Sequence, residues 1–205
     1  MKPYQIIEDI IPQGYQNFLD RLCDDKDFPY FWTPKISYNP EDKKFKDPLI
    51  KNPPGWTHNV FDIDKGENSL ALPHVRPVLW FLEQKTGLQV DTLKRIRIRR
   101  TTIQKDFTKE NYCPPHVDLG TIEPYWSLVY YVDNSDGNTI LFDREWKPED
   151  PDNLFEETSH KKLFESIPVK GNGLLFKGKM YHAGNCPSYF QKRTVINFDF
   201  TVKWF

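Results

Sequence analysis

The spacing of apolar residues differs between the two halves of the chain. Within residues 13–24 the apolar positions recur every three or four residues, which predicts a helix. These positions are Tyr15, Phe18, Leu19 and Leu22. Before this helix, residues 3–8 indicate a short strand, and after it the aromatic run 28–32 (FPYFW) is expected to be extended and part of the core.

The middle of the N-terminal half is harder to assign. Residues 33–67 are rich in Pro, Lys and Asp and indicate a loop, with room for short strands, that could form a lid or rim. Residues 69–86 predict a second helix, despite Pro73 and Pro77, that ends at Gly87. Its expected buried side consists of Leu79, Trp80, Phe81 and Leu82.

From residue 92 the period changes to two. Apolar Ile96 and Ile98 alternate with Arg95, Arg97 and Arg99, which predicts a strand with one buried and one solvated face. Further extended segments, several of them preceded by Gly-containing turns, are expected at 112–120, 126–134, 136–143, 167–178 and 191–205.

A series of short antiparallel strands favours a closed barrel or a double-sheet jelly roll. We therefore expect a mainly β protein, a double-stranded β-helix with N-terminal helices packed on one sheet. The 205 residues predict a single domain, with support elements over about 1–90 and the jelly-roll core over about 91–205. The charged segment 144–166 is expected to be a surface insertion.

Composition narrows the functional classes. Aromatic residues make up 15% of the chain, which excludes a disordered protein, and the formal net charge of −1 gives no general attraction to nucleic acids or membranes. The cysteines, Cys23, Cys113 and Cys186, are widely spaced, and no long apolar stretch occurs. These features predict a soluble, cytoplasmic protein with buried thiols in place of disulfides.

The RIRIRR run at 95–100 allows a second interpretation, a basic stripe for DNA or RNA. A strand with one solvated face has the same pattern and is the expected interpretation. Arg97 or Arg99 could instead line the mouth of a substrate site. A small molecule or a peptide is therefore the expected partner, and not a nucleic acid.

Three residues have the chemistry of a metal site. His116 and Asp118 form a His-x-Asp pair at a strand end, where residues two apart point to the same side. His182 follows the expected strand near 173–177. Two imidazoles and one carboxylate on one side of iron(II) leave three positions open, the facial triad that is typical of non-haem iron oxygenases.

Arg193 extends this constellation. It lies eleven positions after His182 and opens the run TVINFDF. A guanidinium can bind a carboxylate through two hydrogen bonds, as a dicarboxylate co-substrate requires at its far end. A lone His-x-Asp or a lone Arg is usually an ordinary surface feature, so the prediction depends on the four residues together.

The order of four motifs resembles the 2-oxoglutarate/iron(II) dioxygenases, in particular their prolyl 4-hydroxylase-like branch. The matching segments are PPHVDLG, SLVYYVDNSDGNTILF, VKGNGLLFKGKMYHAGNCP and RTVINFDF. The resemblance implies iron(II) held by His116, Asp118 and His182. It also implies 2-oxoglutarate anchored by Arg193, with Tyr131 and Thr139 beside its distal carboxylate, and Tyr130 in place of Tyr131 if the register differs by one.

The activity implied by the resemblance is hydroxylation of a substrate, such as a peptidyl or free amino acid, using dioxygen. 2-Oxoglutarate would be decarboxylated to succinate and carbon dioxide. Asp118 argues against a halogenase, because a carboxylate occupies the position that a halide would need. Arg193, where collagen-type hydroxylases carry Lys, argues against a strict peptidyl-proline substrate.

Other interpretations remain open from the sequence. A cupin-like barrel could keep the fold and the metal without turnover, and an isomerase or hydrolase on the same fold would not need Arg193. Trp126 could cover the metal pocket. Three other histidines, His58, His74 and His160, lack a metal-ligand spacing.

Overall fold

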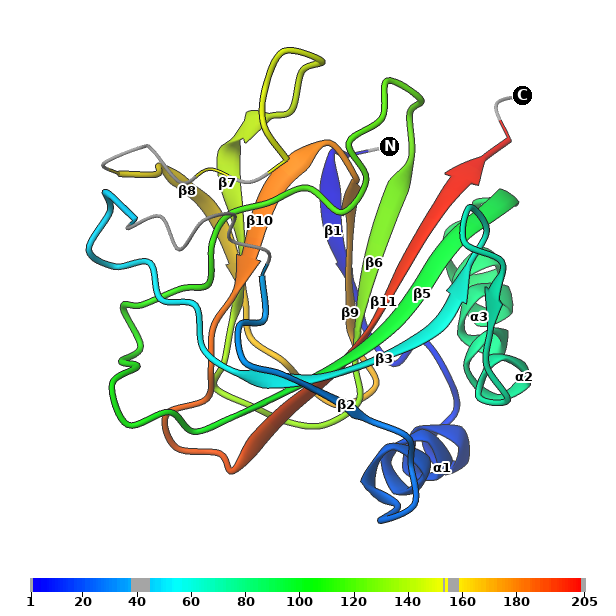
Figure 1. Cartoon of the computed structure of the whole chain (residues 1–205). Helices are drawn as coiled ribbons and strands as arrows, with labels where there is room; N and C mark the ends of the chain where they lie inside the picture. Colours follow the sequence, from blue (N-terminus) through cyan, green and yellow to red (C-terminus); the bar gives the residue numbers. More distant parts are fainter. Residues whose placement is uncertain (1, 38–44, 153, 155–158, 204–205) are drawn as a thin grey trace.

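Two antiparallel sheets face each other in the computed structural model, which describes residues 2–37, 45–152, 154 and 159–203 (Figure 1). The larger sheet contains β1 (Tyr4–Ile7), β2 (Phe31–Thr33), β3 (Gly55–Asp62), β4 (Glu67–Asn68), β5 (Val90–Thr102), β6 (Trp126–Tyr131), β9 (Gly173–Lys177) and β11 (Lys192–Val202). The smaller sheet contains β7 (Thr139–Glu145), β8 (Lys162–Ser166) and β10 (Met180–Gly184).

The strand order is that of a jelly roll. The larger sheet runs β1-β9-β6-β11-β5-β3-β2, with β4 paired to β3, and the smaller sheet runs β10-β7-β8. Apolar side chains from both sheets, among them Tyr131, Leu141 and Phe176, form a buried cluster between them. The predicted mainly β jelly roll is thereby confirmed.

Three helices lie on the outer face of the larger sheet (Figure 1). They are α1 (Gln13–Asp24), α2 (Leu72–Val75) and α3 (Pro77–Thr86). The helix over 13–24 has the predicted bounds. The helix expected over 69–86 is two helices, because Pro77 has no N–H and cannot continue the hydrogen-bond ladder of α2.

The buried side of this helical pair also differs from the expectation. Val75, Val78, Leu79 and Leu82 form the buried stripe, at the spacing of one helix face. Trp80 lies off that stripe and is 57% exposed, and Phe81 is only partly buried.

Two strands, β8 and β10, were not predicted: β8 lies within the expected surface insertion, and β10 contains His182. β3 lies within 33–67, where a loop with room for short strands was expected. Polar residues interrupt the alternation in β3, and β8 is half-exposed, so neither has a regular period. The insertion is also not purely a surface feature, because Trp146 and Leu154 are buried.

The alternation along β5 places two kinds of side chain on opposite faces. Ile96 and Ile98 are fully buried against the helices, in a cluster with Leu128 and Phe198. The arginines at 95, 97 and 99 therefore face the space between the sheets. The prediction that this face of the strand is solvated is wrong, because the arginines are half-buried and line cavities.

Among the described residues, no helix is long and apolar enough to cross a membrane.

Candidate active site

His116, Asp118 and His182 come together between the two sheets. Each offers one ligand atom, and these atoms lie within 4.8 Å of one another. The backbones of His116 and His182 form an isolated antiparallel bridge, with both N–H···O distances at 2.9 Å. This bridge attaches the loop that carries His-x-Asp to β10, so residues far apart in sequence share one site.

Backbone carbonyls orient both imidazoles. His116 Nδ1 lies 3.0 Å from the Pro114 carbonyl, and His182 Nδ1 lies 3.2 Å from the Met180 carbonyl. A carbonyl only accepts, so each Nδ1 carries the proton and each Nε2 keeps its lone pair for a metal. His182 Nε2 and Asp118 Oδ2 are buried without a hydrogen-bond partner and lie 3.2 Å apart, which leaves two donor atoms directed at one point.

An ionic network holds Asp118 in position. Arg95 Nη2 donates to Asp118 Oδ1 at 2.5 Å and lies 2.9 Å from Asp199 Oδ2, and Ser127 Oγ donates to Asp199 Oδ1 at 2.7 Å. Burial opposes ionisation of Asp118, but Arg95, His182 and His116 together outweigh burial and hold the pKa of Asp118 well below the usual range. Asp118 is therefore the ionised carboxylate that a metal requires.

The pKa of the second carboxylate in the network, Asp199, is shifted in the opposite direction. Burial, and then the charge of Asp118, raise the pKa of Asp199 to about 6. Asp199 orients Arg95 without reaching the ligand cluster itself. The roles of Arg95 and Asp199 were not predicted: alternation with apolar neighbours places each on one face of its strand, but it does not show that the two residues pair.

His116 is held in its neutral form. Burial, and then His182, lower the pKa of His116 to about 3. A neutral imidazole is the form that ligates a metal, so His116 is available as a ligand across the whole physiological pH range.

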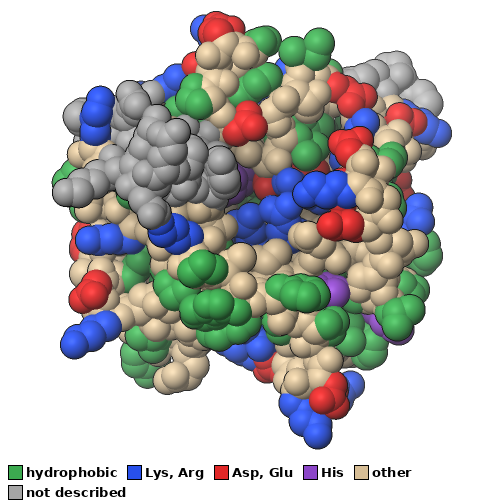
Figure 2. All heavy atoms as spheres, in the orientation of Figure 1, with side chains coloured by type: hydrophobic (Ala, Val, Ile, Leu, Met, Phe, Trp, Pro, Cys, Tyr) green, Lys and Arg blue, Asp and Glu red, His purple; other side chains and the backbone are tan. Residues whose placement is uncertain are grey.

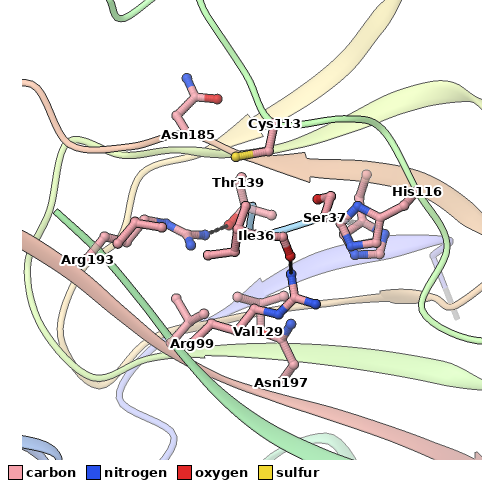
Figure 3. A pocket seen from close by; sticks show the side chains of 14 residues that line it. Ile36, Ser37, Arg99, Cys113, His116, Val129, Thr139, Asn185, Arg193 and Asn197 are labelled. Atoms are coloured by element: carbon pink, nitrogen blue, oxygen red, sulfur yellow. Dashed lines mark hydrogen bonds between the residues drawn. The ribbon is translucent and has the colours of Figure 1, made fainter. Parts of the chain in front are cut away.

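A narrow pocket leads from the histidines to Arg193 (Figure 3). His116 and Arg193 lie at opposite ends of the labelled side chains, with Val129, Arg99 and Asn197 along one wall. His182, Thr139 and Asn185 also line this pocket. Two of the predicted metal ligands, His116 and His182, therefore share one cavity with the predicted anchor.

Arg193 is buried and has only neutral hydrogen-bond partners. Its Nε donates to the Gly137 carbonyl at 2.6 Å and its Nη2 donates to Thr139 Oγ1 at 2.8 Å. Gly137 provides the space, because a Cβ there would lie 2.8 Å from Arg193 Cδ. The guanidinium is a fixed cation at one end of the pocket, with no acidic partner among the described residues.

Tyr131 supports this end from behind. Its hydroxyl lies 3.0 Å from Thr139 Oγ1 and 2.8 Å from Ser166 Oγ. It does not line the pocket itself. Tyr130 faces the opposite side of β6 and packs in the cluster under the helices, so of the two tyrosines Tyr131 is the one on the pocket side.

Other candidates lie outside the ligand cluster. Trp126 packs under the helices and does not cover the pocket. The cysteines are buried and unpaired, and burial raises the pKa of Cys113, which lines the pocket, to about 12. His58 is held by the Pro29 carbonyl and Ser69. Within the described part of the chain, the His116, Asp118 and His182 cluster is the metal-ligand set that the geometry supports.

No protein-family model and no curated protein matches the sequence. Solved structures do share the fold. A 2OG-Fe(II) oxygenase family oxidoreductase from Burkholderia pseudomallei matches with a TM-score of 0.60 and 12% identity, covering 97% of this chain and 85% of its own. A prolyl-4-hydroxylase from Pseudomonas putida matches with a TM-score of 0.53 and 13% identity, and the match covers 98% of this chain and 94% of the hydroxylase chain.

A third solved structure contains ligands. The epimerase SnoN, in complex with Fe3+, alpha ketoglutarate and nogalamycin RO, matches with a TM-score of 0.57 and 10% identity, covering 97% of this chain and 78% of that one. At these identities the likeness shows a shared fold alone.

Proposed function

We propose that this protein is a 2-oxoglutarate-dependent, iron(II)-dependent oxygenase. The observation that carries the proposal is one pocket with His116 and His182, which form a ligand cluster with Asp118, at one end and the buried cation of Arg193 at the other. A buried guanidinium with neutral partners is costly, and a bound carboxylate would stabilise it. A dicarboxylate that also chelates the metal satisfies both ends.

The donor atoms of these residues suit this role. His116 and His182 would ligate iron through Nε2, and Asp118 through Oδ2, the atom left without a partner. Arg193 would take the distal carboxylate of 2-oxoglutarate, and Thr139, backed by Tyr131, would orient the guanidinium. When bound, the metal would supply activation of dioxygen, coupled to decarboxylation of 2-oxoglutarate to succinate and carbon dioxide.

We propose hydroxylation as the reaction. Asp118 supports it, because the carboxylate keeps the position that a halide would need. The prolyl 4-hydroxylase-like branch remains a proposal from the four motifs, since structures with this fold also include the epimerase.

An anaerobic titration tests the proposal. Metal-free protein would receive iron(II) and then 2-oxoglutarate, while the visible charge-transfer band of a chelated 2-oxo acid is followed. We expect the band in the wild type, its loss in Asp118→Ala, and a higher 2-oxoglutarate requirement in Arg193→Ala. Removing a charge-assisted pair should weaken 2-oxoglutarate binding by about tenfold or more.

Two controls make the outcome decisive. Circular dichroism of each variant shows whether it is folded, and Arg76→Gln, at an exposed helix end, should behave as the wild type. Iron binding without a band would favour the alternative of a cupin-like binding barrel. A normal band in Arg193→Ala would remove Arg193 from the co-substrate site.

A further inference from the structure

A second cavity opens beside the metal ligands, on the side of β5. It has a volume of ≈ 240 Å³ and is lined by Arg95, Arg97 and Arg99 together with His116 and Asp118. Figure 2 shows basic side chains across the centre of the face seen in Figure 1, with acidic and histidine side chains beside them. A group bound in this cavity would lie next to the metal.

The three arginines differ in how their charge is balanced. Arg95 is paired with Asp118 and Asp199. Arg97 donates from Nε to the amide oxygen of Asn59 at 3.1 Å, and Arg99 donates from Nη1 to the Ile36 carbonyl at 3.4 Å. Among the described residues, neither Arg97 nor Arg99 has a carboxylate partner.

The surroundings of Arg97 and Arg99 disfavour the positive charge of each guanidinium. Arg99 Nε is buried without a hydrogen-bond partner. Burial, and then the neighbouring arginine, lower the pKa of Arg97, and the same two causes lower the pKa of Arg99 to about 10. Both residues remain charged at neutral pH, so the cavity holds two cations whose proximity is unfavourable until an anion enters.

Iron(II) and 2-oxoglutarate would not supply this anion. Their charges offset each other, and the distal carboxylate has its own cation in Arg193 at the far end of the first pocket. Arg97 lines only the second cavity, whereas Arg99 lies between the two. Asp152, the remaining acidic residue of the cavity, lies exposed on its rim.

We infer that Arg97 and Arg99 bind an anionic group, a carboxylate or a phosphate, of the primary substrate and thereby hold that substrate beside the metal. This inference rests on the proposed function and adds the substrate class. It also explains why a strand carries three arginines on its inward face, where a barrel core would otherwise be apolar.

A binding experiment without turnover tests the inference. Manganese(II) replaces iron(II), 2-oxoglutarate is saturating, and fluorine NMR follows the relaxation of para-fluorobenzoate and of its neutral match, para-fluorobenzamide. We expect the paramagnetic metal to relax the benzoate much more strongly than the benzamide. para-Fluorophenyl phosphate then distinguishes a carboxylate site from a phosphate site.

Variants assign the effect to residues. Arg97→Gln and Arg99→Gln should each weaken para-fluorobenzoate binding by about tenfold. Arg97→Lys should retain part of the para-fluorobenzoate binding, and Arg76→Gln should leave this binding unchanged. Manganese and 2-oxoglutarate affinities, measured on the same samples, show that the variants are folded.

The outcomes separate the two proposals. Equal relaxation of benzoate and benzamide, or benzoate relaxation that no arginine variant changes, would overturn this inference while metal and 2-oxoglutarate binding stand. Loss of 2-oxoglutarate affinity in Arg99→Gln, with benzoate binding intact, would assign Arg99 to the co-substrate and also overturn it. Absence of metal binding would instead contradict the proposed function.

Discussion

Thr139 joins the cationic end of the pocket to the hydroxyl groups behind it. Its Oγ1 accepts from Arg193 and lies 3.0 Å from the Tyr131 hydroxyl. Thr139→Val keeps the shape but removes the acceptor, so Arg193 should lose its fixed orientation. We expect 2-oxoglutarate to bind about tenfold more weakly in the anaerobic titration.

The comparison with Tyr131→Phe isolates this effect. That variant removes a hydroxyl one step further from the guanidinium, so its effect on 2-oxoglutarate should be smaller. Iron(II) affinity should stay unchanged in both variants, because neither residue belongs to the ligand cluster. Unchanged 2-oxoglutarate affinity in Thr139→Val would show that the Gly137 carbonyl alone orients Arg193.

His116 makes the stability of the metal-free protein depend on pH. Its pKa is lowered from 6.5 to about 3 in the folded chain, so protonation favours the unfolded chain. The contribution is fully present above pH 6.5 and is lost as the pH falls from 6.5 towards 3. Its slope is at most about 1.4 kcal/mol per pH unit.

Urea unfolding of the wild type and His116→Gln, in the presence of a chelator, measures this contribution. Between about pH 7.5 and pH 4.5 the wild type should lose free energy of unfolding relative to the variant. A difference between the two proteins that is constant over this range would contradict the lowered pKa. Excess manganese(II) should reduce the effect, because a bound metal keeps His116 deprotonated.

The candidate ligand residues could be predicted from the sequence, because residue type alone identifies two imidazoles, a carboxylate and a cation. The His-x-Asp spacing also places two of these residues together. Arg95 was not accessible in the same way. Its role depends on the register that pairs β5 with β11, where Arg95 stands opposite Asp199, and a partner 104 positions away leaves no local pattern.

At the scale of elements, the two faces of β5 have different roles: one face packs in the core and stabilises the fold, and the other faces the cavity. Ile98 is fully buried under the helices, whereas Arg97 faces the cavity. Ile98→Ala should lower the free energy of unfolding by about 2–5 kcal/mol through lost burial and a cavity. Its affinities for iron(II) and 2-oxoglutarate should stay as in the wild type.

Urea unfolding and the anaerobic titration on the same samples test this separation. Arg97→Gln is the matched variant on the other face, and it should not lower the free energy of unfolding, because burial and a like charge oppose the cation it removes. Weaker 2-oxoglutarate binding in folded Ile98→Ala would mean that the helix-side core also sets the pocket geometry.

The elements that could be predicted are those with an uninterrupted period. The helix over 13–24 and the strand near 92–104 have regular spacing, and both lie where expected. β8 and β10 were missed, and β3 was allowed for only as a short strand in a loop, because polar residues or bulges break the alternation of these strands. β10, for example, shifts register between Met180 and His182. A strand of this kind is formed by its partners in the sheet, which sequence spacing does not reveal.

At the scale of the whole molecule, the candidate metal site connects the two sheets. His182 belongs to β10 of the smaller sheet, and Arg95, which holds Asp118, belongs to β5 of the larger sheet. A ligand at this point should therefore stabilise the complete fold and not one segment. At a concentration of about one hundred times Kd, a ligand that binds only the folded state adds about 2.7 kcal/mol.

Thermal unfolding with manganese(II), and then with added 2-oxoglutarate, measures this coupling in two steps. The wild type should gain Tm at each step. Asp118→Ala should lose both increments, whereas Arg193→Ala should keep the metal increment and lose most of the second. This pattern follows from the order of binding, since the co-substrate needs both the metal and the cation at the far end. If manganese(II) raised the Tm of Asp118→Ala as much as that of the wild type, the ion would bind elsewhere on the protein. The cluster would then not contribute to this stabilisation of the fold.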